Sequence, residues 1–415
     1  MKHNHDVVLL SLPPDATMRK FLADRSVPLP AGLDWSDADT APAAVVTAVN
    51  SWTDTAARDA LLADLSRVAA LSHPAGREAA YEAATLTNVA VMVQLTSKYS
   101  DLHRAFWLYV HHRGLFDQAM DLLYFDGYEP RAYRHDLGIK VMPDLGPAAL
   151  DAFRVAVGDY YREKQGNGEF GVAYGMVRSS GNVLVTLHLK DLPMLRVEFV
   201  GPTLKQRVGN PEFVPAIEYC PRTGVTQSIV TGGVQYQKAF LTAFAKHILH
   251  CDHIDPQRLR PPHLDLSSLR LGFNVPEVYA DGFVSARVKS ITLQDVQGKM
   301  KIAASAMGRS DDESITDLLR GNPATSGLLG SDWTVTAAQV DLYYPPEPSK
   351  IRRKAVKIEV THRGRLNLHK YDESLKQQLE SYLVLAGILD EGQTLTANVV
   401  RDGQDDPIGA DEDLT

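Results

Sequence analysis

The chain has 415 residues, which suggests two or three domains at the usual size of roughly 100–200 residues each. Apolar residues make up 44% of the chain and charged residues 23%. Both fractions are typical of globular proteins, which excludes wholesale disorder, a collagen-like repeat and a long coiled coil. The formal net charge is −8, and the acidic excess lies in the first 150 and the last 15 residues.

The first 165 residues are predicted to form a mainly helical domain. Asp54 can cap a helix whose apolar residues recur at helical spacing until Pro74 ends the pattern. The next segment, residues 77–98, is apolar almost all round, which suits a helix buried among other helices. Further helical patterns follow at residues 101–113, 115–125 and 147–164.

Residues 166–265 change to the two-residue periodicity of strands. Three runs, at residues 170–177, 183–189 and 194–200, are separated by turn residues and predict an antiparallel meander. A hairpin at residues 213–230 follows, and then a helix that Gly232 and Gly233 introduce. We therefore expect one unit of antiparallel strands followed by a helix.

The same order of elements recurs in residues 266–395. Strands at 283–293 and 299–304 and a hairpin at 334–361 precede a helix that begins near Tyr371. The shared layout suggests an internal duplication, in which two sheets join edge to edge with both helices on one face. The alternative is coincidence, because strands followed by a helix are common in α+β proteins. The predicted fold class is thus α+β, a helical N-terminal domain followed by antiparallel β-meander-plus-helix units.

Residues 396–415 form an acidic tail, which we expect to be disordered because it contains no aromatic residue that could anchor a core. Its acidic side chains are Asp402, Asp405, Asp406, Asp411, Glu412 and Asp413. Solubility is the simplest role for such a tail, and a specific interaction is the alternative.

A cytoplasmic location is expected from the cysteines and from the apolar runs. Cys220 and Cys251 are the only cysteines, too few for a disulfide scaffold and consistent with reduced thiols. The N-terminal apolar run at residues 7–12 is too short for a secretory signal. Other apolar runs also fall well short of the roughly 18 residues of a membrane span, so no membrane segment is expected.

A cluster of histidine and aspartate near residue 250 is a candidate metal site. His247 and His250 are three residues apart and would share a face of a helix, and His253 or Asp255 could complete the ligand set. The alternative is structural, because histidines at a helix C-terminus are favoured by the helix dipole. The spacing matches no metal motif of known specificity.

Other catalytic motifs are weak. Gly166, Gly168 and Gly171 form a G-x-G-x-x-G sequence, but it lies between a predicted helix and a strand, the reverse of a dinucleotide site. No Walker A or G-x-S-x-G sequence is present. Asp341 and Glu359, on neighbouring predicted strands, could be a nuclease-like acid pair, with cross-strand charge pairing as the alternative.

A basic stretch at residues 350–370 is the strongest candidate binding segment. It contrasts with an acidic chain, and Tyr343, Tyr344 and Tyr371 beside it could stack on bases. A solvated strand edge and docking against an acidic surface are the alternatives. The cations assigned to an anionic partner are Arg352, Arg353, Lys354, Lys357, Arg363, Arg365 and Lys370.

These patterns favour a non-enzymatic binding or regulatory protein that engages an anionic partner, with nucleic acid as one candidate, through the basic hairpin at 350–370. One alternative is a metal-dependent hydrolase or nuclease that uses His247, His250, His253 and Asp255. Another is a scaffold subunit of a larger protein complex. The sequence points to no particular cofactor.

Overall fold

The computed structural model describes residues 4–395, apart from residues 86–88, 129–131, 201–202, 261, 276–281, 308–312, 346–354, 391 and 393. Two predictions therefore lie outside the described residues. They are the acidic tail at 396–415 and the placement of three of the predicted cations, Arg352, Arg353 and Lys354.

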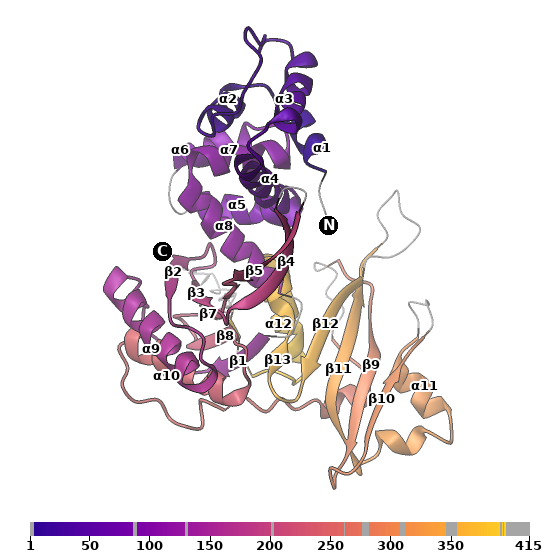
Figure 1. Ribbon diagram of the computed structural model, residues 1–415. Coiled ribbons are helices and arrows are strands. Elements are labelled where there is room, and N and C mark those ends of the chain that lie inside the picture. Colours follow the sequence, from indigo (N-terminus) through magenta and orange to yellow (C-terminus); the bar gives the residue numbers. More distant parts are fainter. Residues whose placement is uncertain are drawn as a thin grey trace, which may run out of the picture.

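A helical region comes first in the chain and lies at one end of the molecule in Figure 1. The predicted cap is confirmed, because the Asp54 carboxylate accepts a hydrogen bond from the Ala57 amide at the start of α4. No helix in the described part of the chain is long and apolar enough to cross a bilayer. The helices are α1 (His5–Leu10), α2 (Ala16–Ala23), α3 (Thr40–Ser51), α4 (Thr55–Ala70), α5 (Pro74–Thr85), α6 (Val89–Thr96), α7 (Asp101–His111) and α8 (Arg113–Asp126).

After Asp126 the chain enters a large antiparallel sheet, and the predicted α+β class is confirmed at this level. The strand order is β10-β9-β11-β12-β13-β1-β8-β7-β3-β2, with β6 paired to β3. The strands of this sheet are β1 (Ala132–Asp136), β2 (Gly171–Val177), β3 (Val183–Lys190), β6 (Glu212–Phe213), β7 (Ala216–Tyr219), β8 (Val225–Ile229), β9 (Ser285–Asp295), β10 (Lys301–Ser305), β11 (Trp333–Tyr343), β12 (Ala355–Thr361) and β13 (Arg365–Leu366).

Two short strands join the halves of the sheet edge to edge. β1, which the sequence analysis did not identify, pairs with β8 on one side and with β13 on the other. Tyr133 of β1 therefore stands opposite both Ser228 and Arg365. The two sets of strands form one continuous sheet.

The two long helices that follow these sets of strands cover opposite faces of the sheet, so the expectation of a shared face was wrong. Ile217 of β7 is buried with Phe240 of α10 (Val234–His247), beside α9 (Pro147–Gln165). The next residue, Glu218, instead binds Lys376 of α12 (Glu373–Leu385). Neighbouring strand residues project to opposite faces, so α10 and α12 lie on opposite sides.

The strand order also differs between the two units. The first follows the chain as β2-β3-β7-β8, whereas the second runs β10-β9-β11-β12, with its first two strands exchanged. The structure does not show an internal duplication.

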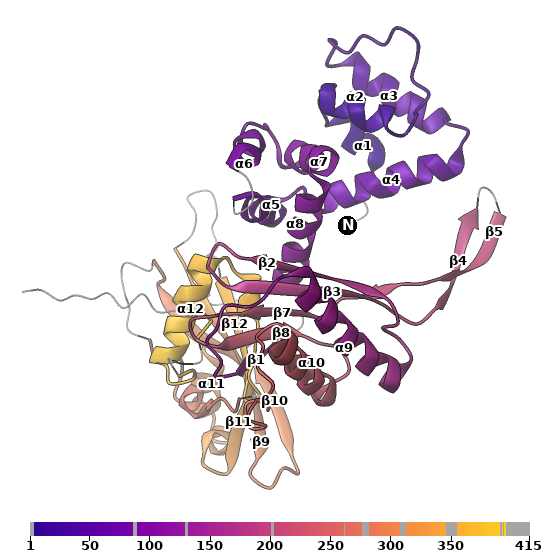
Figure 2. The ribbon, with the colours of Figure 1, turned by 90° about the vertical axis from the view of Figure 1, so that its left-hand side faces the viewer.

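The predicted meander was wrong at its third strand. β4 (Met194–Val200) lies outside the large sheet and pairs with β5 (Thr203–Gly209) in a separate two-stranded ribbon. β5 was not predicted, and β7 occupies the place beside β3 that β4 was expected to fill. In Figure 2 the ribbon projects away from the sheet.

The half of the sheet formed by β9–β12 is hydrophobic on one face and polar on the other. Its hydrophobic face packs against α12, α11 (Ile315–Gly321) and the short helix η1 (Ser267–Arg270). Every second residue of β12, from Val356 to Val360, is buried there, while Lys357 on the other face is exposed. Buried and accessible side chains thus alternate along this strand.

Candidate functional site

Charged side chains are buried between the central strands and α12. Glu218 of β7 accepts a hydrogen bond from the Lys376 Nζ of α12 at 2.9 Å, and Asn182 donates to the same carboxylate at 2.9 Å. One turn further along α12, Glu380 accepts from Arg134 of β1 at 2.6 Å. All four charged side chains are at most 2% exposed. Such burial is tolerated only because each charge is paired.

Arg178 extends this network into the helical region. It follows β2 directly, and its guanidinium binds Glu82 of α5 and Asp126 of α8 with N–O distances between 2.8 and 3.2 Å. It also lies 3.6 Å from Glu218. One side chain therefore joins α5, α8 and the sheet.

The ionisation of the network follows from burial and pairing. Burial raises the pKa of Glu218, but Lys376 and Arg178 outweigh it and lower that pKa to about 2. Burial likewise opposes the charge of Glu82, yet Arg178 lowers its pKa below the usual value. For Asp126, burial dominates, and the pKa is raised despite Arg178. At neutral pH, Glu218 and Glu82 are therefore ionised.

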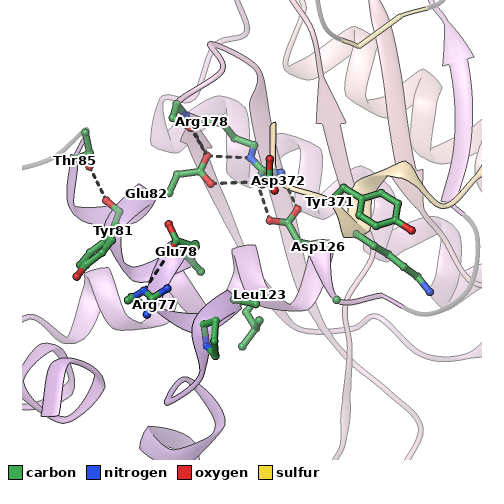
Figure 3. Close-up of a pocket in the computed structure, with 16 residues that line it drawn as sticks. Arg77, Glu78, Tyr81, Glu82, Thr85, Leu123, Asp126, Arg178, Tyr371 and Asp372 are labelled. Carbon is green, nitrogen blue, oxygen red and sulfur yellow. Dashed lines mark hydrogen bonds and ion pairs between the residues drawn. The ribbon is translucent and has the colours of Figure 1, made fainter. Parts of the chain in front are cut away.

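A cleft of about 710 Å³ opens beside Arg178, between the helical region and the start of α12. Figure 3 shows Glu82 and Asp126 directed at Arg178 on one side and Tyr371 on the other. The lining residues are Pro74, Ala75, Arg77, Glu78, Ala79, Tyr81, Glu82, Thr85, Leu123, Asp126, Gly127, Arg178, Ser179, Lys370, Tyr371 and Asp372.

The charges that line this cleft are largely paired with one another. Arg77 binds Glu78 at 3.1 Å, and the Asp372 carboxylate accepts from the Leu375 amide at the start of α12. Arg178 is bound by its two carboxylates as described. An anion entering the cleft would therefore meet carboxylates beside each arginine, so the cleft is a poor place for an anionic partner.

The described members of the predicted cationic set lie in two places. Lys370 lines the cleft. Lys357 and Arg365 lie on the polar face of β12 and β13, and Arg363 lies in the turn between those strands. The Arg365 guanidinium stacks 4.0 Å above the Tyr133 ring.

The tyrosines expected to stack on bases have structural contacts instead. The Tyr371 hydroxyl donates to the Lys357 carbonyl at 2.6 Å and accepts from the Lys357 amide at 3.1 Å. Tyr343 is buried at the end of β11. Base stacking by Tyr371 and Tyr343 remains a prediction. The positions of these two side chains in the structure do not favour it.

The suspected nuclease-like acids are not cross-strand partners. Asp341 stands opposite Lys357, and Glu359 stands opposite Gln339. Asp341 is buried and accepts from the Gln339 side chain at 2.7 Å. The register thus does not place the two acids directly opposite each other, and among the described contacts Asp341 is bound by Gln339 and forms no ion pair with Lys357.

The residues of the predicted metal site are held in separate contacts. α10 ends at His247, so His250 is not on the same helix. His250 Nε2 lies 3.0 Å from Asp144, and the Asp255 carboxylate accepts from the Gln257 amide. The His253 carbonyl accepts from the Cys251 thiol at 3.2 Å. No group of three or more His, Cys, Asp or Glu side chains within the described ranges is arranged to hold a metal ion.

No protein-family model matches this chain, and no match was found among curated proteins or among solved structures. Its function must therefore be argued from the contacts, burial and charge described above.

Proposed function

We propose that this chain is a binding protein that engages an anionic partner, with nucleic acid as the first candidate, through Lys357, Arg363 and Arg365. The observation that carries the proposal is the position of these cations at the solvent-accessible polar face of β12 and β13, opposite the hydrophobic face. Within the described residues, neither Lys357 nor Arg363 has an ion-pair partner in the structure, so both charges are available.

Arg365 adds a directional element to this surface. Its guanidinium lies over the Tyr133 ring, and β1 and β13 hold the two residues in register. A stacked guanidinium keeps its N–H groups in a fixed plane, which suits recognition of a phosphate or carboxylate by two parallel hydrogen bonds. Lys357 and Arg363 would supply less directional charge beside it.

The paired state of the other acidic and basic groups supports a binding role over catalysis. The carboxylates of Glu82 and Asp126, which line the cleft, both bind Arg178, and the buried Glu218 binds Lys376. A general acid or base needs access to its substrate. Glu218 lacks such access, and Glu82 and Asp126 are held at the cleft in ion pairs with Arg178.

The proposal predicts that the Lys357→Glu, Arg363→Glu double variant binds short DNA or RNA more weakly than the wild type. Each phosphate contact contributes roughly 0.9 to the slope of log K against log salt concentration. We therefore expect the slope to become shallower by about 2 in a fluorescence-anisotropy titration at several salt concentrations.

The matched control is the Lys299→Glu, Lys301→Glu variant, because it makes the same charge change at two exposed lysines at the β10 edge of the sheet. This variant should retain the wild-type slope. The proposal fails for nucleic acid if wild type and both variants bind equally poorly at low salt. It fails for this surface if the control loses as much affinity as the double variant.

A further inference from the structure

The ribbon of β4 and β5, residues 194–200 and 203–209 and here termed the arm, stands apart from the large sheet. Its strands pair in register from Met194 opposite Gly209 to Val200 opposite Thr203. In Figure 2 it extends from the sheet along one side of the helical region. An isolated two-stranded hairpin is only marginally stable in water, so a long arm of this kind needs a covering surface.

The two faces of the arm differ sharply in chemistry. On one face Leu195 stands opposite Val208 and Phe199 opposite Leu204, with Val197 and its partner Gln206 between them. These five side chains are 58–71% exposed. The other face carries Arg196, Glu198, Lys205 and Arg207.

A largely apolar exposed face of this kind marks an interaction surface. Five side chains of this size, each about two-thirds exposed, offer on the order of 600 Å². A standard protein interface buries roughly 800 Å² from each partner. The arm alone therefore supplies most of what one side of a stable interface requires.

We propose that the arm is covered by the arm of a second copy of this chain, apolar face against apolar face, across a two-fold axis. A two-fold interface requires a patch that is complementary to itself, and a strip of aliphatic and aromatic side chains meets that condition. Two such ribbons would stack as a small β-sandwich, with strand faces about 10 Å apart.

The charges on the arm favour contact between the apolar faces, with the arm of a second copy as the partner. Arg196 and Arg207 are directly opposite each other, so the charged face is predominantly basic, and two such faces repel. Glu198 binds Arg207 at 3.2 Å and offsets only part of that charge. In the proposed dimer the basic faces point outward into water. A nucleic acid would contact the basic face and leave the apolar one uncovered.

The experiment is a mass measurement by light scattering and analytical ultracentrifugation on the full chain. We expect the wild type to be a dimer at micromolar concentration and Leu204→Glu to have half its mass, because a carboxylate would be buried in the interface. Thr203→Glu is the matched control, since it places the same charge on the neighbouring residue of the opposite face. It should remain dimeric.

Cross-linking distinguishes this dimer from one formed elsewhere. In a Cys251→Ser background, where the remaining Cys220 is buried, a short bis-maleimide should link Val197→Cys chains into dimers. It should link Lys205→Cys chains, changed on the opposite face, much less. A monomeric wild type overturns the proposal, whether the arm is then covered by another protein, by lipid or by the helical region of its own chain. A Leu204→Glu dimer, a monomeric Thr203→Glu variant or equal cross-linking of both cysteines also overturns it.

Discussion

Replacing Arg178 with methionine is expected to lower the free energy of unfolding by about 3–5 kcal/mol, the usual cost of breaking a buried ion pair. The guanidinium is 9% exposed and binds both Glu82 and Asp126. Methionine would fill much of the space but would leave these carboxylates without their cation. Urea unfolding monitored by tryptophan fluorescence and by circular dichroism measures the loss.

Arg162→Met is the control for this prediction. Arg162 binds Asp159 on the surface of α9, where both side chains are 56% exposed. Surface pairs of this kind contribute roughly 0–1 kcal/mol. A loss at Arg178 no larger than the loss at Arg162 would contradict the view that the network joins the helical region to the sheet.

The loss of unfolding free energy caused by Arg178→Met should also become smaller in acid. The pKa of Asp126 is already raised by burial, and removing Arg178 raises it further. A carboxyl group with a raised folded pKa loses its unfavourable burial energy as it binds a proton. The difference in stability between wild type and Arg178→Met should therefore narrow as the pH falls from 7 through this raised pKa.

Glu218→Gln is expected to have the second large effect, a loss of stability whose size depends on pH. The folded pKa of Glu218 is about 2, compared with 4.5 for a model carboxyl. A lowered folded pKa contributes stability that is fully present above pH 4.5 and is lost as the pH falls toward 2. The difference between these two pKa values corresponds to a stabilisation of the folded state on the order of 3 kcal/mol.

The measurement is the free energy of urea unfolding of wild type and Glu218→Gln across this acid range. The variant should be less stable at pH 7, and the two curves should converge as the pH approaches 2. Glu163→Gln, at an exposed position on α9, should run parallel to the wild type throughout. Curves for Glu218→Gln that stay parallel to the wild type would mean that Lys376 and Arg178 do not hold this carboxylate ionised.

This network of buried charges could not be predicted from the sequence, because its members come from distant segments. Glu218 and Lys376 are 158 positions apart, and Arg134 and Glu380 are 246 apart. One local signal did exist, since Glu218 interrupts an apolar strand between Ile217 and Tyr219. A lone acid in such a strand is equally consistent with an exposed face. Only the position of α12 in the structure shows that Glu218 is buried.

The cationic surface was partly accessible from the sequence. The basic stretch at residues 350–370 was identified from the sequence, and the structure leaves Lys357 and Arg363 within it exposed. The role of Lys370 could not be separated from that of Lys357, because only the fold places Lys370 at the cleft and Lys357 on the polar face. The proposed metal ligands show the same limit, since a helix ending at His247 removes the spacing that grouped His247 with His250.

By itself, the sequence determined the local features of this protein: the helical start, the strand periodicity and the Asp54 cap, as well as the hairpin of β11 and β12. These depend on residues close together in the chain. Only the tertiary structure decided that β4 leaves the sheet, that α10 and α12 take opposite faces, and which charges are buried. Strand partners and burial are set by competition among distant segments for the same surfaces, and no local pattern records its outcome.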